Sequence, residues 1–425
     1  MSLQSEGVIN LSDVGMNNRS HDAAPGLTVA ANLSLACGAG ALYLSPSQAD
    51  CSAMVGGGEF CSNGDPGYVL NSTLVLQGGY APHFTVRGSP SARAFLSYGP
   101  GAALAPLVSI GGPSATGKQT ASGITLQDLN LRAGETGVMM YSVARIRLLR
   151  VFIDVEVHTG SKNNCAVVVV NAYWIQMQQS EFKGPSKLGD QPVVVLRGDV
   201  DGVVGTTYLV RMEEIVINNG GIRYEQRKNI PSANDQYADM GGFFFFNSIV
   251  LESSGLPLFE VWSDPSLANV TGIEQVTIID YQNADSQPVQ YSSDRQPVVA
   301  MNCSQPDCTL DGLNILGASA GVYNPDKVRG FDRPNGTHPA VRVYAGRVQA
   351  VTISGSHFTG GSDVVDNNSV PTGNWAARNS GGGWTMVSDQ HVSTYLLRTI
   401  CMQYLYAMLL CELNTMYVLR IDFTE

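Results

Sequence analysis

The chain has 425 residues, of which 44% are hydrophobic and 14% charged, and its formal net charge is −11. This is enough apolar material for a large core in one to three domains. The negative charge disfavours nucleic acid and anionic membranes as partners. The 46 glycines, together with abundant Val, Thr, Ser and Asn, favour a β-rich chain with many turns over a helical one.

The N-terminal segment has a pattern of its own. The first ten residues, MSLQSEGVIN, contain no basic residue and no apolar run, so no signal peptide is visible. Residues 21–46 read as a short apolar helix, a glycine stop and a strand, and residues 67–88 read as paired strands. We expect this segment to differ in structure from the rest of the chain.

A spacing of apolar or small residues at positions 0, +2, +5 and +7 recurs through the middle of the chain. The alternation at +2 indicates a strand with one buried face, and the change to +5 indicates a corner where the strand bends. Eight copies occur, 22 to 39 residues apart. They begin at Ile124, Ile146, Ile175, Val210, Ile249, Val276 (a partial copy), Leu313 and Val351.

Most copies follow a second apolar strand, for example 137–143, 166–173, 192–199 and 242–247. One such unit cannot bury its inner face, whereas stacked units bury a continuous apolar column. We therefore predict an all-β fold, a right-handed parallel β-helix. A β-sandwich would show even spacing and hairpin turns instead. Long segments after the motif, at 154–165, 183–191, 218–240, 282–296 and 321–339, predict a walled binding face on one side.

The C-terminal residues 388–425 are unusually apolar, but Arg398, Gln403, Glu412 and Asn414 interrupt them. A capping helix is the first interpretation, an end that is not native the second, and a membrane anchor the third. We divide the chain into an N-terminal cap with the first strands at 1–100, β-helix rungs at 101–375, and a linker with a divergent tail at 376–425.

The N-terminal segment resembles the cap of the pectin-lyase-like β-helix superfamily, in particular rhamnogalacturonase/epimerase-like and β-1,3-glucanase-like proteins. The matching places are 31–37, ALYLSP at 41–46, Gly67-Tyr68 and 74–76, while the usual acidic start is reduced to Asp22. The resemblance covers about 70 residues at the cap and, more loosely, the rungs to about residue 360. It implies a β-helix and carbohydrate chemistry.

Glycoside hydrolysis needs two carboxylates separated by roughly 5–9 Å. In the repeat alignment Glu213 and Glu252 occupy equivalent outward places on consecutive rungs, with Arg211 nearby to moderate their repulsion, and Glu181 is a third candidate. These acids are the candidate catalytic residues, and solvated outward charges are the alternative. The acid motifs of polygalacturonases are missing: Asn163 and Asn164 stand where acids would be expected.

Other chemistry has less support. Asp199 and Asp201 in the GDVDG loop would suit a calcium ion, but a polar turn explains them as well. The six histidines show no zinc spacing, and residues 111–118 lack the end of a phosphate-binding loop. We expect no cofactor.

Aromatic side chains on outward turns and loops are candidates for stacking against sugar rings. From these we select Trp174, Tyr224, Trp262 and Tyr281, with Arg211, as candidate substrate-binding residues; Tyr173, Tyr208, Tyr237 and Tyr323 belong to the same wider set. Basic residues in the long loops would suit an anionic polysaccharide.

Cysteines and glycosylation sequons bear on the compartment. Cys51 with Cys61, and Cys303 with Cys308, are candidate local disulfides, or free core thiols if the protein is intracellular. Eight Asn-x-Ser/Thr sequons occur, of which Asn71, Asn269, Asn302 and Asn335 are the candidate glycosylation sites. These features favour a secreted or cell-surface protein, whose leader would lie outside this sequence.

Two functions follow from these patterns. The first is an extracellular enzyme that processes a polysaccharide, a glycosidase or lyase. The second is a non-catalytic β-helix that binds glycans or serves as a structural or adhesive surface protein.

Overall fold

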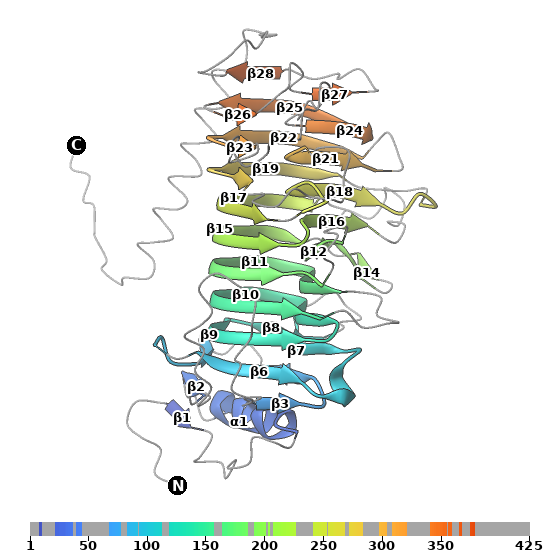
Figure 1. Cartoon of the computed structure of the whole chain (residues 1–425). Helices are drawn as coiled ribbons and strands as arrows, with labels where there is room; N and C mark the ends of the chain where they lie inside the picture. Colours follow the sequence, from blue (N-terminus) through green and yellow to red (C-terminus); the bar gives the residue numbers. More distant parts are fainter. Residues whose placement is uncertain are drawn as a thin grey trace, which may run out of the picture.

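In the computed structural model the chain winds into a long stack of parallel strands, from α1 at one end to β28 at the other (Figure 1). A connection that returns a chain to a parallel neighbour is right-handed in nearly all proteins. The fold is the predicted right-handed parallel β-helix. The described residues are 8–10, 22–36, 40–44, 68–77, 83–91, 93–112, 119–156, 164–185, 191–200, 203–204, 207–226, 241–252, 254–267, 272–283, 297–303, 308–320, 341–354, 356–358, 365–367 and 375–378.

Each rung has three sides, which we call faces A, B and C in chain order. Face A contains β4 (Leu74–Leu76), β7 (Pro106–Gly111), the starts of β10 (Thr136–Val155) and β11 (Cys165–Lys183), β12 (Val194–Arg197), β16 (Ile222–Gln226), β18 (Phe259–Ser263), β21 (Val299–Asn302), β24 (Val341–Ala345) and β27 (Val365–Asn367).

Face B contains β1 (Val8–Asn10), β2 (Ala41–Tyr43), β5 (Phe84–Arg87), the start of β9 (Ile124–Ala133), the middles of β10 and β11, the starts of β15 (Tyr208–Asn218) and β17 (Gly241–Glu252), β19 (Ile273–Ile279), β22 (Thr309–Leu316), β25 (Arg347–Ser354) and β28 (Trp375–Arg378).

Face C contains β3 (Tyr68–Leu70), β6 (Ala94–Tyr98), the ends of β9, β10, β11, β15 and β17, and then β20 (Gln282–Asn283), β23 (Ser319–Ala320) and β26 (His357–Phe358). The remaining elements are β8 (Ala121–Ser122), which pairs with β10, the antiparallel pair β13 (Asp199–Val200) and β14 (Val203–Val204), and a 3-10 helix, η3 (Pro100–Ala102).

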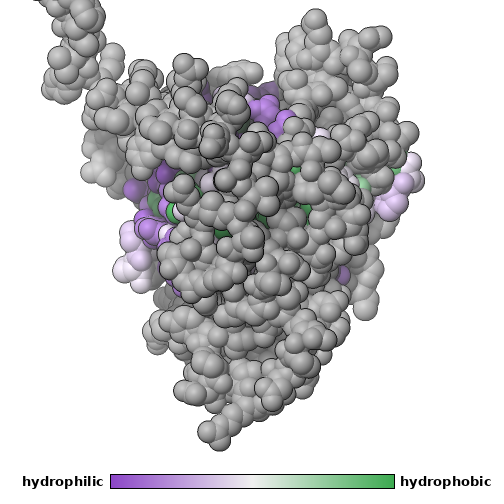
Figure 2. Space-filling view, turned by 90° about the horizontal axis from the view of Figure 1, so that it is seen from above, coloured by the Kyte–Doolittle hydropathy of each residue, from purple (hydrophilic) through white to green (hydrophobic). Residues whose placement is uncertain are grey.

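The apolar positions of the repeat point inward and form one continuous core. Ile175, Met177 and Phe182 of one rung, for instance, are each 0% exposed. Seen along the stack, the described residues that reach the rim are mostly hydrophilic, and hydrophobic ones show mainly between them (Figure 2). Stacking therefore buries the apolar inward side chains that a single rung would leave exposed to solvent, as in other solenoid proteins.

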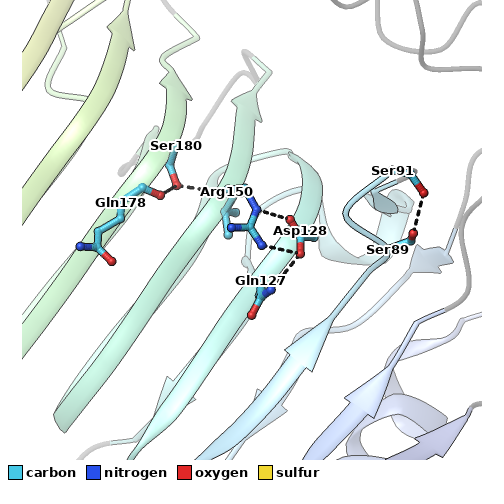
Figure 3. A network of polar contacts seen from close by, with 8 residues as sticks. Ser89, Ser91, Gln127, Asp128, Arg150, Gln178 and Ser180 are labelled. Atoms are coloured by element: carbon cyan, nitrogen blue, oxygen red, sulfur yellow. Dashed lines mark hydrogen bonds and ion pairs between the residues drawn. The ribbon is translucent and has the colours of Figure 1, made fainter. Parts of the chain in front are cut away.

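The corner between faces B and C is built by one residue in the left-handed conformation, at position +4 of the repeat. Its φ lies between 51° and 64° in Asp128, Arg150, Gln179, Glu214, Ser248, Asp280 and Gly317. One left-handed residue breaks the alternation of side chains, which explains why the apolar spacing changes from +2 to +5. Neighbouring corner residues also bind one another: Arg150 Nε and Nη2 lie 2.6 and 3.0 Å from the Asp128 carboxylate (Figure 3).

Serine at position +5 has a structural role at this corner. The Ser180 hydroxyl accepts the backbone N–H of Val151 on the preceding rung (3.0 Å) and donates to the carbonyl of Gln178 (2.7 Å; Figure 3). Ser356 makes the same pair of bonds with Ala318 N–H (3.0 Å) and the Ser354 carbonyl (3.2 Å). Ser180 and Ser356 therefore fill the same place, position +5, in one repeated corner.

One copy of the repeat was placed wrongly from the sequence. Val210 pairs with Phe244 and Ile215 pairs with Ile249, so the face B strand of this rung begins at Phe244 and not at Ile249. The error arises because the pairs at 0/+2 and +5/+7 have the same spacing, so a shift of five residues still matches. Residues 242–247 thus belong to face B. The matching face A strand is β16, which interrupts the expected loop at 218–240.

The predicted helix is α1 (Ala24–Ala36), which lies at the N-terminal end of the stack (Figure 1). Its N-terminus is capped by Asp22, whose carboxylate accepts the backbone N–H groups of Ala24 (3.1 Å) and Asn71 (2.9 Å). This capping bond ties the helix to the turn after β3. The C-terminal tail at 388–425 lies outside the described residues, and the division into three parts remains a prediction.

Candidate functional site

Four aromatic residues gather where face A turns into face B. We call Tyr173, Trp174, Tyr208 and Phe243 the aromatic shelf. The rings of Tyr173 and Tyr208 are stacked on neighbouring rungs, with centroids 5.8 Å and planes 9° apart. Trp174 meets Tyr173 edge-on at 6.4 Å, and Phe243 meets Tyr208 edge-on at 5.4 Å. Tyr173 is 41% exposed, so the shelf presents aromatic surface to solvent.

Two small residues give the Tyr208 and Tyr173 rings their room. A Cβ atom on Gly242 would lie 2.0 Å from Cδ2 of Tyr208, so only glycine leaves space for this ring. On the other side, Ala144 is the rung neighbour of Tyr173. The Tyr208 ring can therefore lie against the backbone of Gly242 on one side of the stacked pair. On the other side, the Tyr173 ring faces the small side chain of Ala144.

The corner below the shelf carries bulky side chains in a conformation that favours glycine. Successive rungs place Gly123, Arg145, Trp174 and Leu209 at this corner, with φ of 71°, 55°, 63° and 56°. A non-glycine residue there costs roughly 1–2 kcal/mol. Because the B–C corner has the same conformation on seven rungs, the positive φ belongs to the turn, and it is the side chains of Arg145 and Trp174 that make this corner a candidate site. The Arg145 guanidinium carbon lies 5.9 Å from the centroid of the Trp174 ring.

A row of polar side chains runs along face B beside the shelf. Arg147 Nε donates to Gln178 Oε1 (3.0 Å), and Gln178 Nε2 donates to Glu213 Oε2 (2.6 Å) on the next rung. Arg211 forms an ion pair with Glu213 and lies over the Phe245 ring at 5.2 Å. The predicted proximity of Arg211 and Glu213 is thus present, and the row offers donors and acceptors across three rungs.

The predicted carboxylate pair Glu213 and Glu252 does not form. Glu213 lies opposite Asn247 on face B, whereas Glu252 lies opposite Asn218 on face C, beyond the left-handed corner. The reason is that the face B strand of this rung begins at Phe244 and not at Ile249, so Glu252 lies five positions further along the rung than the sequence predicted. Glu181 also lies on face C, so Glu181 and Glu252 share one face and Glu213 lies on another.

Two acids of face C, Glu181 and Asp154, have a raised pKa. Asn218 Nδ2 donates to Glu181 Oε1 (2.9 Å), and Lys183 Nζ lies 3.6 Å from Asp154 Oδ1. Burial raises the pKa of Glu181, and the charge of Glu252 raises it further. Burial also raises the pKa of Asp154, although Lys183 opposes this effect. Asp154 was not singled out from the sequence.

The other predicted substrate-binding residues lie apart from the shelf. Trp262 is half-buried on face A, where Arg223 lies over its ring at 5.6 Å and pairs with Glu260 at 2.7 Å. Tyr224 and Tyr281 are only 3% and 2% exposed and pack in the core, so their expected outward placement is wrong. Tyr281 occupies position +5 of the repeat, which is an inward position on every rung.

Of the candidate disulfide and glycosylation residues, the structure describes Cys303, Cys308, Asn71 and Asn302. Cys303 and Cys308 form a disulfide in the structure, with Cα atoms 6.1 Å apart, and it closes the connection from β21 to β22. Asn71 and Asn302 are half-buried, and Asn302 Nδ2 lies 3.4 Å from Glu260 Oε1. The remaining candidates, Cys51, Cys61, Asn269 and Asn335, lie outside the described residues.

Two classes of feature are absent from the described part of the chain. Among these residues no group of three or more His, Cys, Asp or Glu side chains is placed to hold a metal ion. Of the helices that the structure describes, none is long and apolar enough to cross a membrane.

The sequence pointed to part of this site. Trp174 and Arg211 were selected, and Tyr173 and Tyr208 belonged to the wider aromatic set. Phe243 and Arg145 were missed. Phe243 was assigned to a core strand because four phenylalanines run together. Arg145 could have been found from its place one residue before the repeat, which is the place that Trp174 occupies on the next rung.

The stack of parallel rungs with a helical cap defines the fold as a right-handed parallel β-helix. No family model and no curated protein matches it. A solved chain described as Geobacillus virus E2 ORF18 has a TM-score of 0.46 and 9% identity over 89% of this chain, which spans 63% of the length of the viral chain. Endo-xylogalacturonan hydrolase from Aspergillus tubingensis has a TM-score of 0.49 and 13% identity, covering 88% of this chain and 97% of the hydrolase. PfbA, a surface adhesin of Streptococcus pneumoniae, has a TM-score of 0.37 and 10% identity, covering 90% of this chain and 96% of the adhesin. At these identities the likeness concerns the path of the chain.

Proposed function

We propose that this protein is a carbohydrate-active β-helix that binds a polysaccharide along face B, with the aromatic shelf as its main contact. The observation that carries the proposal is the stacked pair of exposed Tyr173 and half-buried Tyr208, with Trp174 beside it. Aromatic rings bind the apolar faces of sugars, and stacked aromatic contacts add about 0.5–1.5 kcal/mol beyond buried area.

The polar row supports the same function. Sugar hydroxyl groups both donate and accept hydrogen bonds, and so require side chains of both kinds within reach. Arg147, Gln178 and Glu213 supply donors and acceptors on three consecutive rungs. Since rungs repeat at about 4.8 Å, a polymer that runs along the stack meets a similar set of groups at each step.

The experiment is a panel of soluble polysaccharides cast into native gels, in which a bound polymer retards the protein. Tyr173→Ala removes the exposed ring and is expected to lower affinity about tenfold for every polymer that the wild-type protein binds. The matched control is Leu104→Ala, which removes an exposed apolar side chain at a distance from the shelf. If no polymer retards the wild-type protein, or if Tyr173→Ala is retarded equally, the proposal is wrong.

A hydrolase or lyase is the second candidate function, and one observation favours it. Glu181 has a raised pKa, as a general acid requires, and Asp154 and Glu252 lie on the same face. The test is release of reducing ends or unsaturated products from the polymers that bind. If this interpretation holds, Glu181→Gln and Glu252→Gln should each abolish product release. Glu213→Gln, on face B, tests whether Glu213 acts together with Glu252, as the sequence predicted.

A secreted or surface location is part of the proposal, and the Cys303–Cys308 disulfide supports it, because such bonds persist in oxidising compartments. The measurement is the mass of the peptide that contains both cysteines, isolated from the native source without reduction. Two free thiols in that peptide would count against an extracellular location.

A further inference from the structure

We infer that Arg145 makes the shelf selective for glycans that carry an anionic substituent. This inference rests on the proposed binding function and adds the chemical class of the ligand. Arg145 is exposed, and its guanidinium lies over the Trp174 ring, 5.9 Å from the centroid. A sugar that stacks on the free side of Tyr173 would lie above Ala144 and beside this guanidinium.

The arginines on face B and at its two corners differ in what they bind. Arg147 donates to Gln178, Arg150 is paired with Asp128, and Arg211 is paired with Glu213. Arg145 has no hydrogen-bonded or ion-paired carboxylate among the residues that the structure describes; its recorded contact is with the Trp174 ring. Toward the described residues the guanidinium keeps its hydrogen-bond donors available, and these match the geometry of a carboxylate or sulfate.

The backbone gives a second, independent argument. Arg145 and Trp174 occupy successive places on a corner where Gly123 shows that glycine fits, and both have positive φ. The aromatic ring holds the guanidinium from one side and restricts its motion. This ordering lowers the entropic cost of binding an anion. In a chain with a net charge of −11, an exposed arginine fixed in this way gives the shelf a local positive charge that attracts anionic ligands.

The ligand chemistry is a negatively charged group on a sugar ring, either a carboxylate or a sulfate ester, and the test separates the two. Each anionic polymer is compared with a neutral form of the same backbone: carboxymethyl cellulose with hydroxyethyl cellulose, and dextran sulfate with dextran. Affinity is measured for the wild-type protein, Arg145→Gln and Tyr173→Ala. The control is Arg93→Gln, which removes the same charge from the residue just before β6 on face C, away from the proposed binding face.

The wild-type protein is expected to bind one of the anionic polymers at least fivefold more tightly than its neutral form. Arg145→Gln should lose on the order of tenfold for that polymer and leave binding of the neutral form unchanged. Arg93→Gln should leave both affinities unchanged. Tyr173→Ala should weaken both forms alike.

Different results would overturn the selectivity inference and the proposed binding function. If anionic and neutral forms bind equally, or if Arg145→Gln and Arg93→Gln weaken anionic binding by the same factor, the selectivity inference is overturned and the binding function stands. If no polymer binds, or if Tyr173→Ala binds as tightly as the wild-type protein, the proposed function is overturned and the inference falls with it.

Discussion

The ring of Tyr173 stacks on the ring of Tyr208 in the next rung, with centroids 5.8 Å apart and planes 9° apart. This relationship depends on the parallel register, which places the two residues side by side although 35 positions separate them in the sequence. Because Tyr173 is 41% exposed, the stack is an ordered aromatic surface and not part of the core. The predictions below test the shelf and the rungs that support it.

Gly242→Ala should disrupt the shelf from beneath. The new Cβ would lie 2.0 Å from the Tyr208 ring, which must move, and overpacking of this kind costs about 1–3 kcal/mol. We expect a lower free energy of unfolding in urea and weaker polysaccharide binding. Gly312→Ala is the matched control, because its Cβ would meet no atom closer than 3.5 Å. Equal stability of both variants would contradict the packing described.

Trp174→Gly and Trp174→Ala should separate backbone strain from ring contacts. Both variants lose the ring, but only glycine relieves the left-handed conformation at φ of 63°. We expect Trp174→Gly to be more stable than Trp174→Ala by about 1 kcal/mol in urea unfolding. Both should bind polysaccharide equally weakly. If alanine proves the more stable of the two, the corner is not strained in solution.

Ser180→Ala should destabilise the fold by about 1–3 kcal/mol, because the buried N–H of Val151 loses its acceptor. Ser356→Ala should behave in the same way at its own corner. Ser91→Ala removes a hydroxyl that is exposed and bonds only to Ser89 among the contacts described, and should change stability little. Thermal unfolding of the three variants measures the difference, and three similar values would show that the corner hydroxyls are dispensable.

Glu181→Gln should stabilise the protein in a manner that depends on pH. The pKa of Glu181 is raised in the folded state above its ordinary value of 4.5, so the folded protein holds this proton more tightly than the unfolded chain. Stability is therefore lost as pH rises from 4.5 through the folded pKa, and the variant does not suffer that loss. We expect the variant to be more stable at pH 7 and equal to the wild type below pH 4 in urea unfolding. A difference that is constant across this range would show that ionisation is not its cause.

Much of the fold could be predicted because the rungs repeat one physical rule. Inward residues at 0, +2, +5 and +7 are apolar or small on most rungs, and Ser180 and Ser356 are polar exceptions explained by the corner. The pattern failed at Phe244, where two apolar pairs with identical spacing allow two registers and only the pairing of neighbouring strands decides between them.

The site was harder to predict because it depends on contacts between rungs. Register alone brings Tyr208 beside Tyr173 and places Arg145 over Trp174. The same error of five residues that misplaced Ile249 also produced the Glu213–Glu252 pair. Tyr281 could have been recognised as inward from its place at +5, whereas the burial of Tyr224 follows from a face A strand, β16, that the sequence did not reveal.

The most direct measurement is the affinity of the wild-type protein and of Tyr173→Ala for a polysaccharide that retards the wild-type protein in the gel panel, determined by isothermal titration calorimetry. Circular dichroism checks that both proteins are folded. We predict that Tyr173→Ala unfolds at the same temperature as the wild type within a few degrees and binds about tenfold more weakly. Equal affinity of the two folded proteins, or failure of the wild type to bind any polymer of the panel, would contradict the account.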